Sequence, residues 1–234
     1  MGAWPHVVFP RSHVLIEQDG ARPVLTTPNH VVFYKPHQLY RRGLRDPLGD
    51  RCVWLEASPA VFEVPDAPAG PCAPGTFLLA LALARHLDLE PVPDRLLAEE
   101  AALRLLAVGA PAAGRSSELS EAAKEWLAER FDQPLSLAAV AAALNVSRFH
   151  LARVFRASTG FSLTRYVHEL RLRRAVERLA EDPGLSLTGL ALELGYCSPS
   201  HFSDCFRAAF GRPPSSLRGT QLRTIMEAGR ARAA

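Results

Sequence analysis

Side chains suited to contacting nucleic acid gather in a short segment in the second half of the chain, 147–156. Four of them share one helix face: Phe149, His150, Ala152 and Arg153. An arginine guanidinium can bond the O6 and N7 atoms of guanine together, and an apolar ring can contact the methyl group of thymine. Three neighbours suit phosphates, which fix the register without specifying sequence: Ser147, Arg148 and Arg156. The segment therefore predicts direct contact with DNA bases.

A second segment of the same kind follows about 50 residues later, at 198–207. The corresponding positions for base contact are Ser200, His201, Ser203 and Asp204. Phosphate contacts are expected from Ser198, Arg207 and, between the two segments, Arg165. A carboxylate at Asp204 is repelled by phosphates and can accept only from cytosine N4. Two interpretations stay open: this segment contacts bases weakly, or Asp204 pairs with Arg207 at i,i+3.

Both segments need a helix-turn-helix to position them. In that motif the first helix needs a small residue where the second crosses it, and the turn favours Gly or Asn because its backbone has positive φ. After Leu137 the small residue is Ala141 and the turn residue is Asn145. The apolar positions that face inward are Val140, Leu144, Val146, Leu151, Val154 and Phe155. Every demanding position of a helix-turn-helix is thus filled.

The pattern recurs in the second segment. The first helix and the turn, Val140, Ala141, Leu144, Asn145 and Val146, are repeated by Leu190, Ala191, Leu194, Gly195 and Tyr196. The inner face of the second helix, Leu151, Val154 and Phe155, is repeated by Phe202, Cys205 and Phe206. We expect helices at about 119–131, 137–144, 148–158, 162–181, 187–194, 199–210 and 214–228. Five serines stand where these helices begin and can cap them: Ser136, Ser147, Ser162, Ser186 and Ser198.

Residues 119–220 resemble the DNA-binding domain of AraC/XylS-type transcription regulators over its full length. The matching motifs are Phe155-Arg156, Thr159-Gly160, Arg171-Leu-Arg-Arg-Ala175, Leu190-Ala191, Leu194-Gly195-Tyr196, Phe202, Phe206-Arg207, Phe210-Gly211 and Pro213-Pro214. The resemblance implies two helix-turn-helix subdomains bridged by a long helix. It also implies that their recognition helices enter successive major grooves of double-stranded DNA, one turn or roughly 34 Å apart.

The charge distribution agrees with a polyanionic partner for this part of the chain. The net charge is only +3, but residues 1–114 carry 10 basic and 12 acidic side chains, and residues 115–234 carry 17 and 12. Between 133 and 180 the count is 8 basic against 2 acidic. The longest wholly apolar run, 77–84, is too short for a membrane span, and no signal peptide is evident. We therefore expect a cytoplasmic protein with no membrane contact.

The first third of the chain predicts β structure. Short runs rich in β-branched and aromatic residues lie at 13–16, 30–34, 51–55 and 60–64, between turn formers. Helices are expected at about 75–89 and 93–108, and the composition of 109–118 is that of a linker. The predicted organisation is a small cupin-like β-barrel with a helix pair (1–108), a linker (109–118) and an all-α domain of two helix-turn-helix subdomains joined by a long helix (119–234).

In AraC-type proteins such an N-terminal domain binds an effector and forms a homodimer, so the resemblance implies both here. Candidate effector-binding residues are Phe33, His37, Tyr40 and Trp54, although core packing explains these aromatic rings equally well. Candidate dimerisation residues are Leu96, Leu103 and Leu106, with closure of the domain's own core as the alternative. The histidines lack the H-x-H pattern of metal-binding cupins, so no metal or other cofactor is expected.

An enzyme is not expected, because the sequence lacks the G-x-S-x-G, H-E-x-x-H and G-x-x-x-x-G-K-[ST] motifs. An Ada-like repair methyltransferase would need four cysteines before the helix-turn-helix region, and only Cys52 and Cys72 precede it. Cys197 and Cys205 complete the set of four, and redox sensing by any of them stays open. The alternative function is an effector-independent regulator whose N-terminal domain only dimerises or contacts RNA polymerase.

Overall fold

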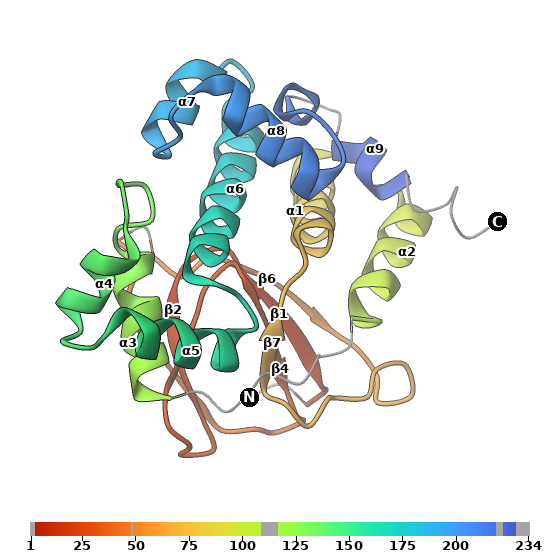
Figure 1. Cartoon of the computed structure of the whole chain (residues 1–234). Helices are drawn as coiled ribbons and strands as arrows, with labels where there is room; N and C mark the ends of the chain where they lie inside the picture. Colours follow the sequence, from red (N-terminus) through yellow and green to blue (C-terminus); the bar gives the residue numbers. More distant parts are fainter. Residues whose placement is uncertain (1–2, 48, 109–116, 219–221, 228–234) are drawn as a thin grey trace. The chain divides into compact units, whose positions relative to one another are not determined.

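The computed structural model describes residues 3–47, 49–108, 117–218 and 222–227 (Figure 1). Seven strands come first: β1 (His6–Pro10), β2 (Val14–Gln18), β3 (Val24–Thr26), β4 (His30–Tyr34), β5 (Tyr40–Leu44), β6 (Cys52–Glu56) and β7 (Ala69–Pro71). The helices that follow are α1 (Pro74–Leu89), α2 (Arg95–Leu106), α3 (Glu118–Ala128), α4 (Leu137–Ala143), α5 (Arg148–Thr159), α6 (Leu163–Glu181), α7 (Leu187–Glu193), α8 (Pro199–Phe210), the 3-10 helix η1 (Pro214–Leu217) and α9 (Leu222–Glu227). No helix of the described segments is long and apolar enough to cross a membrane.

The strands form two antiparallel sheets in the described part of the chain, with orders β6-β1-β4-β7 and β3-β2-β5. Buried side chains from both sheets share one apolar cluster: Val8, Val14, Ile16, Val32 and Tyr34. The sheets do not close into one continuous barrel, an arrangement compatible with a cupin-like fold. The predicted fold class is therefore confirmed, a β-rich N-terminal region followed by helices.

The predicted strand at 60–64 is wrong. The backbone N–H groups of Val61 and Phe62 both donate to the Ser58 carbonyl, at 2.8 and 3.0 Å, which makes a turn in place of a strand. Phe62 is buried because the turn directs its ring inward, where it lies 6.3 Å from Phe33 between ring centroids. Of the residues at 60–64, only Phe62 is buried.

Contacts between elements divide the chain into two compact units. The first contains residues 1–72 and 109–170, and therefore the strands, α3 to α5 and the start of α6. Its helical core is a cluster of buried residues: Ala123, Leu127, Val140, Ala141, Leu151, Phe155, Leu163, Tyr166, Val167 and Leu170. The helix boundaries predicted for this part agree with the structure to within about three residues at each end.

The second unit contains residues 73–108 and 171–234. In it, α1 packs against α2, α8 and α9, and seven consecutive residues of α1, Phe77 to Leu83, are buried. This packing explains the all-round apolar character of α1 without a partner subunit. On α2 the buried face is Leu97, Ala101 and Leu105, at i, i+4 and i+8. In place of the single helix expected at 214–228, the structure has two short helices, η1 and α9. Residues 219–221, between them, are not among the described residues.

The division into domains at 109–118 stays a prediction, since residues 109–116 lie outside the described residues. Directly after them Ser117 caps α3, its hydroxyl accepting from the backbone N–H of Ser120 at 3.2 Å.

Candidate nucleic-acid interface

The helix-turn-helix of the first unit consists of α4 and α5. Ser136 caps α4, and Asn145 occupies the turn with φ of 52°. The backbone N–H of Val146 donates to the carbonyl of Ala141, the small buried residue, at 3.0 Å. Ser147 then caps α5 by accepting from the backbone N–H of His150 at 3.2 Å. These bonds fix the entry of α5 and with it the direction of its first turn.

The face of α5 opposite the core carries the residues predicted to contact bases. Leu151 and Phe155 are fully buried, so the other side of the helix is turned to solvent. The Phe149 side chain is 85% exposed, which is unusual for a phenylalanine and gives it no role in the core. His150, Arg148, Arg153 and Arg156 are exposed as well, and Ala152 is half-buried. The structure thus brings these predicted site residues together on one accessible face.

The second unit repeats this geometry with α7 and α8. Gly195 takes the turn with φ of 73°, and the backbone N–H of Tyr196 donates to the Ala191 carbonyl at 2.9 Å, as Val146 does to Ala141. Ser198 caps α8 by accepting from the backbone N–H of His201 at 3.2 Å. The predicted repeat is therefore present in the backbone hydrogen bonds as well as in the residue types.

The exposed face of α8 differs from that of α5 in charge. Ser200, His201 and Asp204 are exposed and Ser203 is half-buried. Arg207 Nη1 lies 3.9 Å from Asp204 Oδ1, both side chains being mostly exposed, which is the i,i+3 pairing considered from the sequence. An exposed pair of this length contributes little to stability. It does hold a carboxylate and a guanidinium together on the face that the sequence assigns to DNA.

The thiol of Cys205 on this helix offers little reactivity. Burial raises the pKa of the Cys205 thiol, and the nearby Asp204 carboxylate and Cys197 act in the same direction. Cys205 therefore stays protonated at neutral pH, and a protonated thiol is a poor nucleophile. Cys197 is exposed, with its Sγ 3.5 Å from His201 Nδ1.

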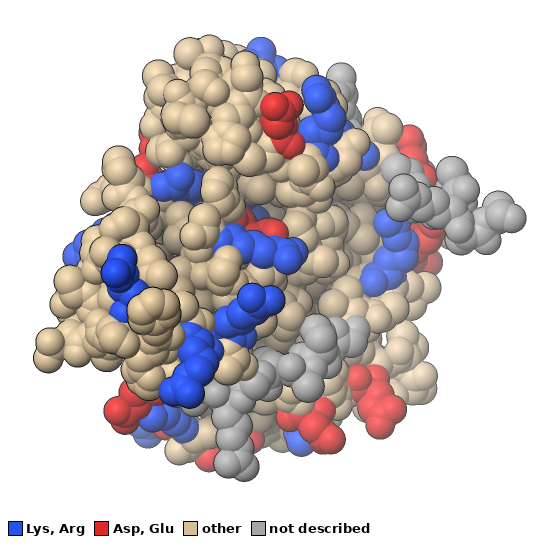
Figure 2. Space-filling view, in the orientation of Figure 1, with Lys and Arg blue, Asp and Glu red and all other residues tan. Residues whose placement is uncertain are grey.

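Basic side chains continue from α5 onto α6. Arg165 is exposed, with its guanidinium carbon 5.0 Å from the centre of the Phe161 ring. Figure 2 shows several Lys and Arg side chains over α5 and the start of α6, with few acidic ones among them. The face carrying the predicted phosphate contacts is thus positively charged.

The four residues predicted to bind an effector lie apart. Tyr40 and Trp54 line one pocket of about 190 Å³, together with His6, Val8, Tyr34, Arg42, Cys52 and Glu56. Phe33 is buried and lines a different cavity, of about 240 Å³, and His37 is exposed in a turn with φ of 58°. Among the described residues, no three His, Cys, Asp or Glu side chains come together in a way that could hold a metal ion.

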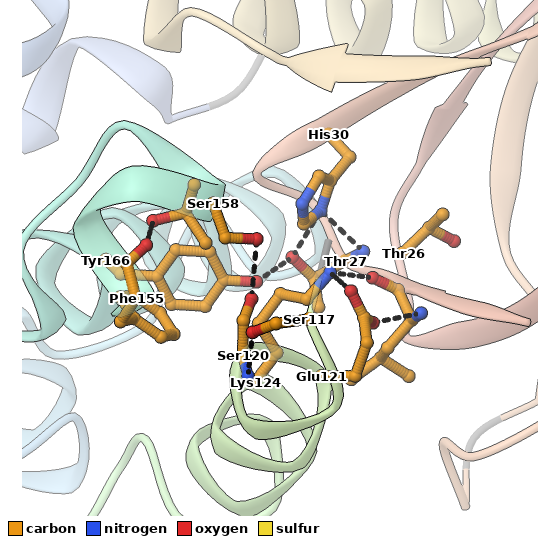
Figure 3. Close-up of polar contacts among 12 residues, drawn as sticks. Thr26, Thr27, His30, Ser117, Ser120, Glu121, Lys124, Phe155, Ser158 and Tyr166 are labelled. Atoms are coloured by element: carbon orange, nitrogen blue, oxygen red, sulfur yellow. Dashed lines mark hydrogen bonds and ion pairs between the residues drawn. The ribbon is translucent and has the colours of Figure 1, made fainter. Parts of the chain in front are cut away.

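One polar cluster in the first unit contains none of the predicted site residues. A hydrogen bond of 2.9 Å links the hydroxyl oxygens of Tyr166, on α6, and Thr27, directly after β3. The Ser120 hydroxyl donates to the Ser158 hydroxyl at 2.7 Å (Figure 3). Beside them Lys124 is 3% exposed, and its Nζ lies 2.7 Å from Glu121 Oε1. The sequence holds one signal of this cluster: Lys124 lies at i+4 from Ser120, on the face of α3 whose other residues are buried.

Comparisons with known proteins agree with this geometry. Residues 140–220 match the family model of a helix-turn-helix domain. The regulatory protein SoxS of Salmonella typhimurium is 41% identical over 96 residues, which cover 40% of this chain and 87% of SoxS. The HTH-type transcriptional regulator GlxA of Rhizobium meliloti is 37% identical over 94 residues, which cover 40% of this chain and 29% of GlxA.

Among solved structures, the C-terminal domain of AraT, a response regulator from Geobacillus stearothermophilus, is similar to this chain. The sequence identity is 30% and the TM-score 0.43, and the match covers 45% of this chain and 87% of that one. The tandem helix-turn-helix and the 41% identity over 87% of SoxS confirm the resemblance found in the sequence. The chain belongs to the AraC/XylS family of DNA-binding transcription regulators.

Proposed function

We propose that this regulator contacts DNA bases with the exposed faces of α5 and α8 and DNA phosphates with the flanking serines and arginines. The observation that carries the proposal is the orientation of α5, whose apolar face is buried while Phe149 and Arg153 point to solvent from the same short helix. Exposing an apolar phenylalanine ring to water is unfavourable, but the ring can contact the methyl group of thymine in the major groove. The Ser147 and Ser198 hydroxyls accept from helix N–H groups and can still donate to a phosphate.

Replacing Arg153 with Ala is expected to weaken binding to the cognate site by about 1–3 kcal/mol and to relax specificity at one base pair. Competition binding against a panel of duplexes with single base-pair changes measures both effects. Arg41→Ala is the matched control, because Arg41 is an exposed arginine of β5, outside the two recognition helices α5 and α8. Equal weakening on every duplex would make Arg153 a phosphate contact and contradict its assignment to a base.

The proposal extends to control by a small molecule bound in the N-terminal region. The pocket lined by Tyr40 and Trp54 supports this part, because it combines aromatic rings with the Arg42 and Glu56 side chains. The His6 and Tyr34 rings stack at 4.6 Å between centroids and stiffen one wall. A ligand of this pocket is expected to stabilise the full chain against heat, and Trp54→Ala is expected to remove that stabilisation. A regulator without effector control would show no such ligand-dependent shift.

We also propose a homodimer formed through α2. Two apolar side chains of this helix are exposed to solvent, Leu96 at 67% and Leu103 at 55%, and Leu106 is half-buried. Leu97, Ala101 and Leu105 fill the core-facing side of α2, so Leu96 and Leu103 belong to no core among the described residues. A symmetric pair of such faces is the usual way to cover them.

The double variant Leu96→Glu/Leu103→Glu is expected to convert a dimer into a monomer at tens of micromolar, because charges cannot be buried unpaired in an apolar interface. Light scattering on the full chain measures the mass; the full chain is needed because α1 packs against α8 and α9. Val61→Glu is the control, since Val61 is 57% exposed in the first unit. A wild-type monomer, or a dimer that survives both glutamates, would contradict the interface.

The remaining parts of the proposal follow from the family. A transcription regulator acts where DNA and RNA polymerase are, so we place it in the cytoplasm with RNA polymerase as a partner. We assign it no catalytic activity. Reporter transcription with purified polymerase would test the partner and decide between activation and repression.

A further inference from the structure

A cavity of about 330 Å³ lies inside the first unit, between β3, the residues around β7 and the helices α3, α5 and α6. It is separate from the pocket of Tyr40 and Trp54, with which it shares no lining residue. Much of its wall is apolar, from Val24, Ala67 and Phe161, and its polar side is formed by Asn29, Lys124 and Tyr166. The volume is at the lower end of the range for small-molecule sites, about 300–1,000 Å³.

The charged side chain in this wall, Lys124, is already paired with Glu121, which lies outside the lining. Lys124 Nζ lies 2.7 Å from Glu121 Oε1 and donates to the Leu25 carbonyl at 3.1 Å, while Glu121 Oε2 accepts from the Leu25 backbone N–H at 2.8 Å. Burial lowers the pKa of Lys124 and the Glu121 carboxylate opposes that shift. A ligand with a formal charge would therefore lose its hydration without gaining a free counter-ion.

The histidine of the wall is already engaged by the chain. The backbone N–H of Thr27 donates to His30 Nδ1 at 3.1 Å, so this nitrogen is not open to a ligand (Figure 3). The cavity is thus suited to an uncharged molecule.

One buried hydrogen-bond acceptor in the wall, the side-chain oxygen of Asn29, has no donor within the described residues. Asn29 is 2% exposed, and its Nδ2 donates to the Tyr166 carbonyl at 3.0 Å. Its Oδ1 is shielded from solvent and has no hydrogen-bond partner within the described residues. A buried amide oxygen without a donor is unfavourable, because it has lost its hydration without gaining a hydrogen bond. A hydroxyl or amide N–H brought by a ligand would satisfy it.

We propose that this cavity binds a small, uncharged, mainly apolar molecule with a single hydrogen-bond donor, such as an alkyl alcohol or amide. The donor lies toward Asn29 and the apolar part lies against Val24, Ala67 and Phe161. Ser158 of α5 and Tyr166 of α6 belong to the same wall, so the bound molecule contacts the helices that carry the first recognition surface as well as the strands.

Four straight-chain probes with different head groups test the charge and the donor separately: 1-octanol, octanoate, octylamine and 1-methoxyoctane. Calorimetric titration and thermal unfolding of the full chain at pH 7 give the affinity and the shift in Tm. We expect saturable binding of 1-octanol, with a Tm rise of a few degrees at a hundredfold excess over Kd. The other three are expected to bind at least about tenfold weaker, for lack of a counter-ion or of a donor.

Filling the cavity is the second arm of the experiment. Ala67→Phe places a ring in the lining, and Ala60→Phe makes the same change at an exposed turn residue that does not line the cavity. The octanol shift is expected to disappear in the first variant and to remain in the second. Octanoate or octylamine binding as tightly as 1-octanol, the ether matching the alcohol, or no binding at all would overturn the proposal. None of these outcomes depends on the protein's DNA contacts.

Discussion

Raising the salt concentration from 50 to 200 mM is expected to weaken binding of one chain to its cognate DNA about 150-fold. Four arginines are assigned to phosphates: Arg148, Arg156, Arg165 and Arg207. Each ion pair with a phosphate releases condensed counterions, and four pairs give a slope of about −3.6 for log K against log salt. Fluorescence anisotropy over a salt series measures the slope directly. A dimer with both chains on DNA would show a steeper dependence.

Single variants assign the slope to residues. Arg148→Ala and Arg156→Ala are each expected to flatten it by about 1. Arg95→Ala is the control, an exposed arginine of α2 whose Nε lies 2.7 Å from Glu99 Oε1. An affinity that stays constant across the salt series would contradict phosphate contacts by these arginines.

The variant Phe155→Ala is expected to lower the free energy of unfolding of the first unit by about 3–5 kcal/mol. Phe155 is fully buried in the helical core, where its ring lies edge-on to Tyr166 at 5.3 Å between centroids. Truncation leaves a cavity between α5 and α6 as well as losing the transfer free energy of the ring. Urea unfolding followed by circular dichroism gives the change.

Phe149→Ala is the matched control for this variant, on the same helix and with the same atoms removed. Because Phe149 is 85% exposed, its loss is expected to change stability by no more than about 0.5 kcal/mol while weakening DNA binding. Equal destabilisation by the two variants would mean that the orientation of α5 described above is wrong.

The helices were predictable because short-range signals define them. Ser136, Ser147, Ser186 and Ser198 accept from the expected N–H groups, and Asn145 and Gly195 occupy the positive-φ turns. These features depend on residues within one turn of each other, so no tertiary information is needed to find them. The exposed face of α5 followed directly from its buried one.

The strands were less predictable because their neighbours in space decide them. β5 has the sequence Tyr-Arg-Arg-Gly-Leu, with no buried residue and no apolar alternation, and exists through its pairing with β2. β3 and β7 have three residues each, too few to show a period. The β-branched and aromatic residues at 60–64 suggested a strand, but no neighbouring strand pairs with this run in the described structure.

The polar cluster around Lys124 could not be predicted for a similar reason. Thr27 and Tyr166 are 139 positions apart in sequence, and Leu25 and Lys124 are 99 apart. No local pattern relates such residues, and only the packing of α3 and α6 against the strands within the first unit brings them together.

Selection from a pool of random duplexes tests the central claim, that both recognition helices contact bases, most directly. The wild-type chain is expected to enrich one motif with two conserved blocks about 10 base pairs apart, one for each helix. Arg153→Ala should lose information at one position of one block and leave the other block unchanged. An enriched motif with a single block, or no enrichment over the starting pool, would contradict the claim.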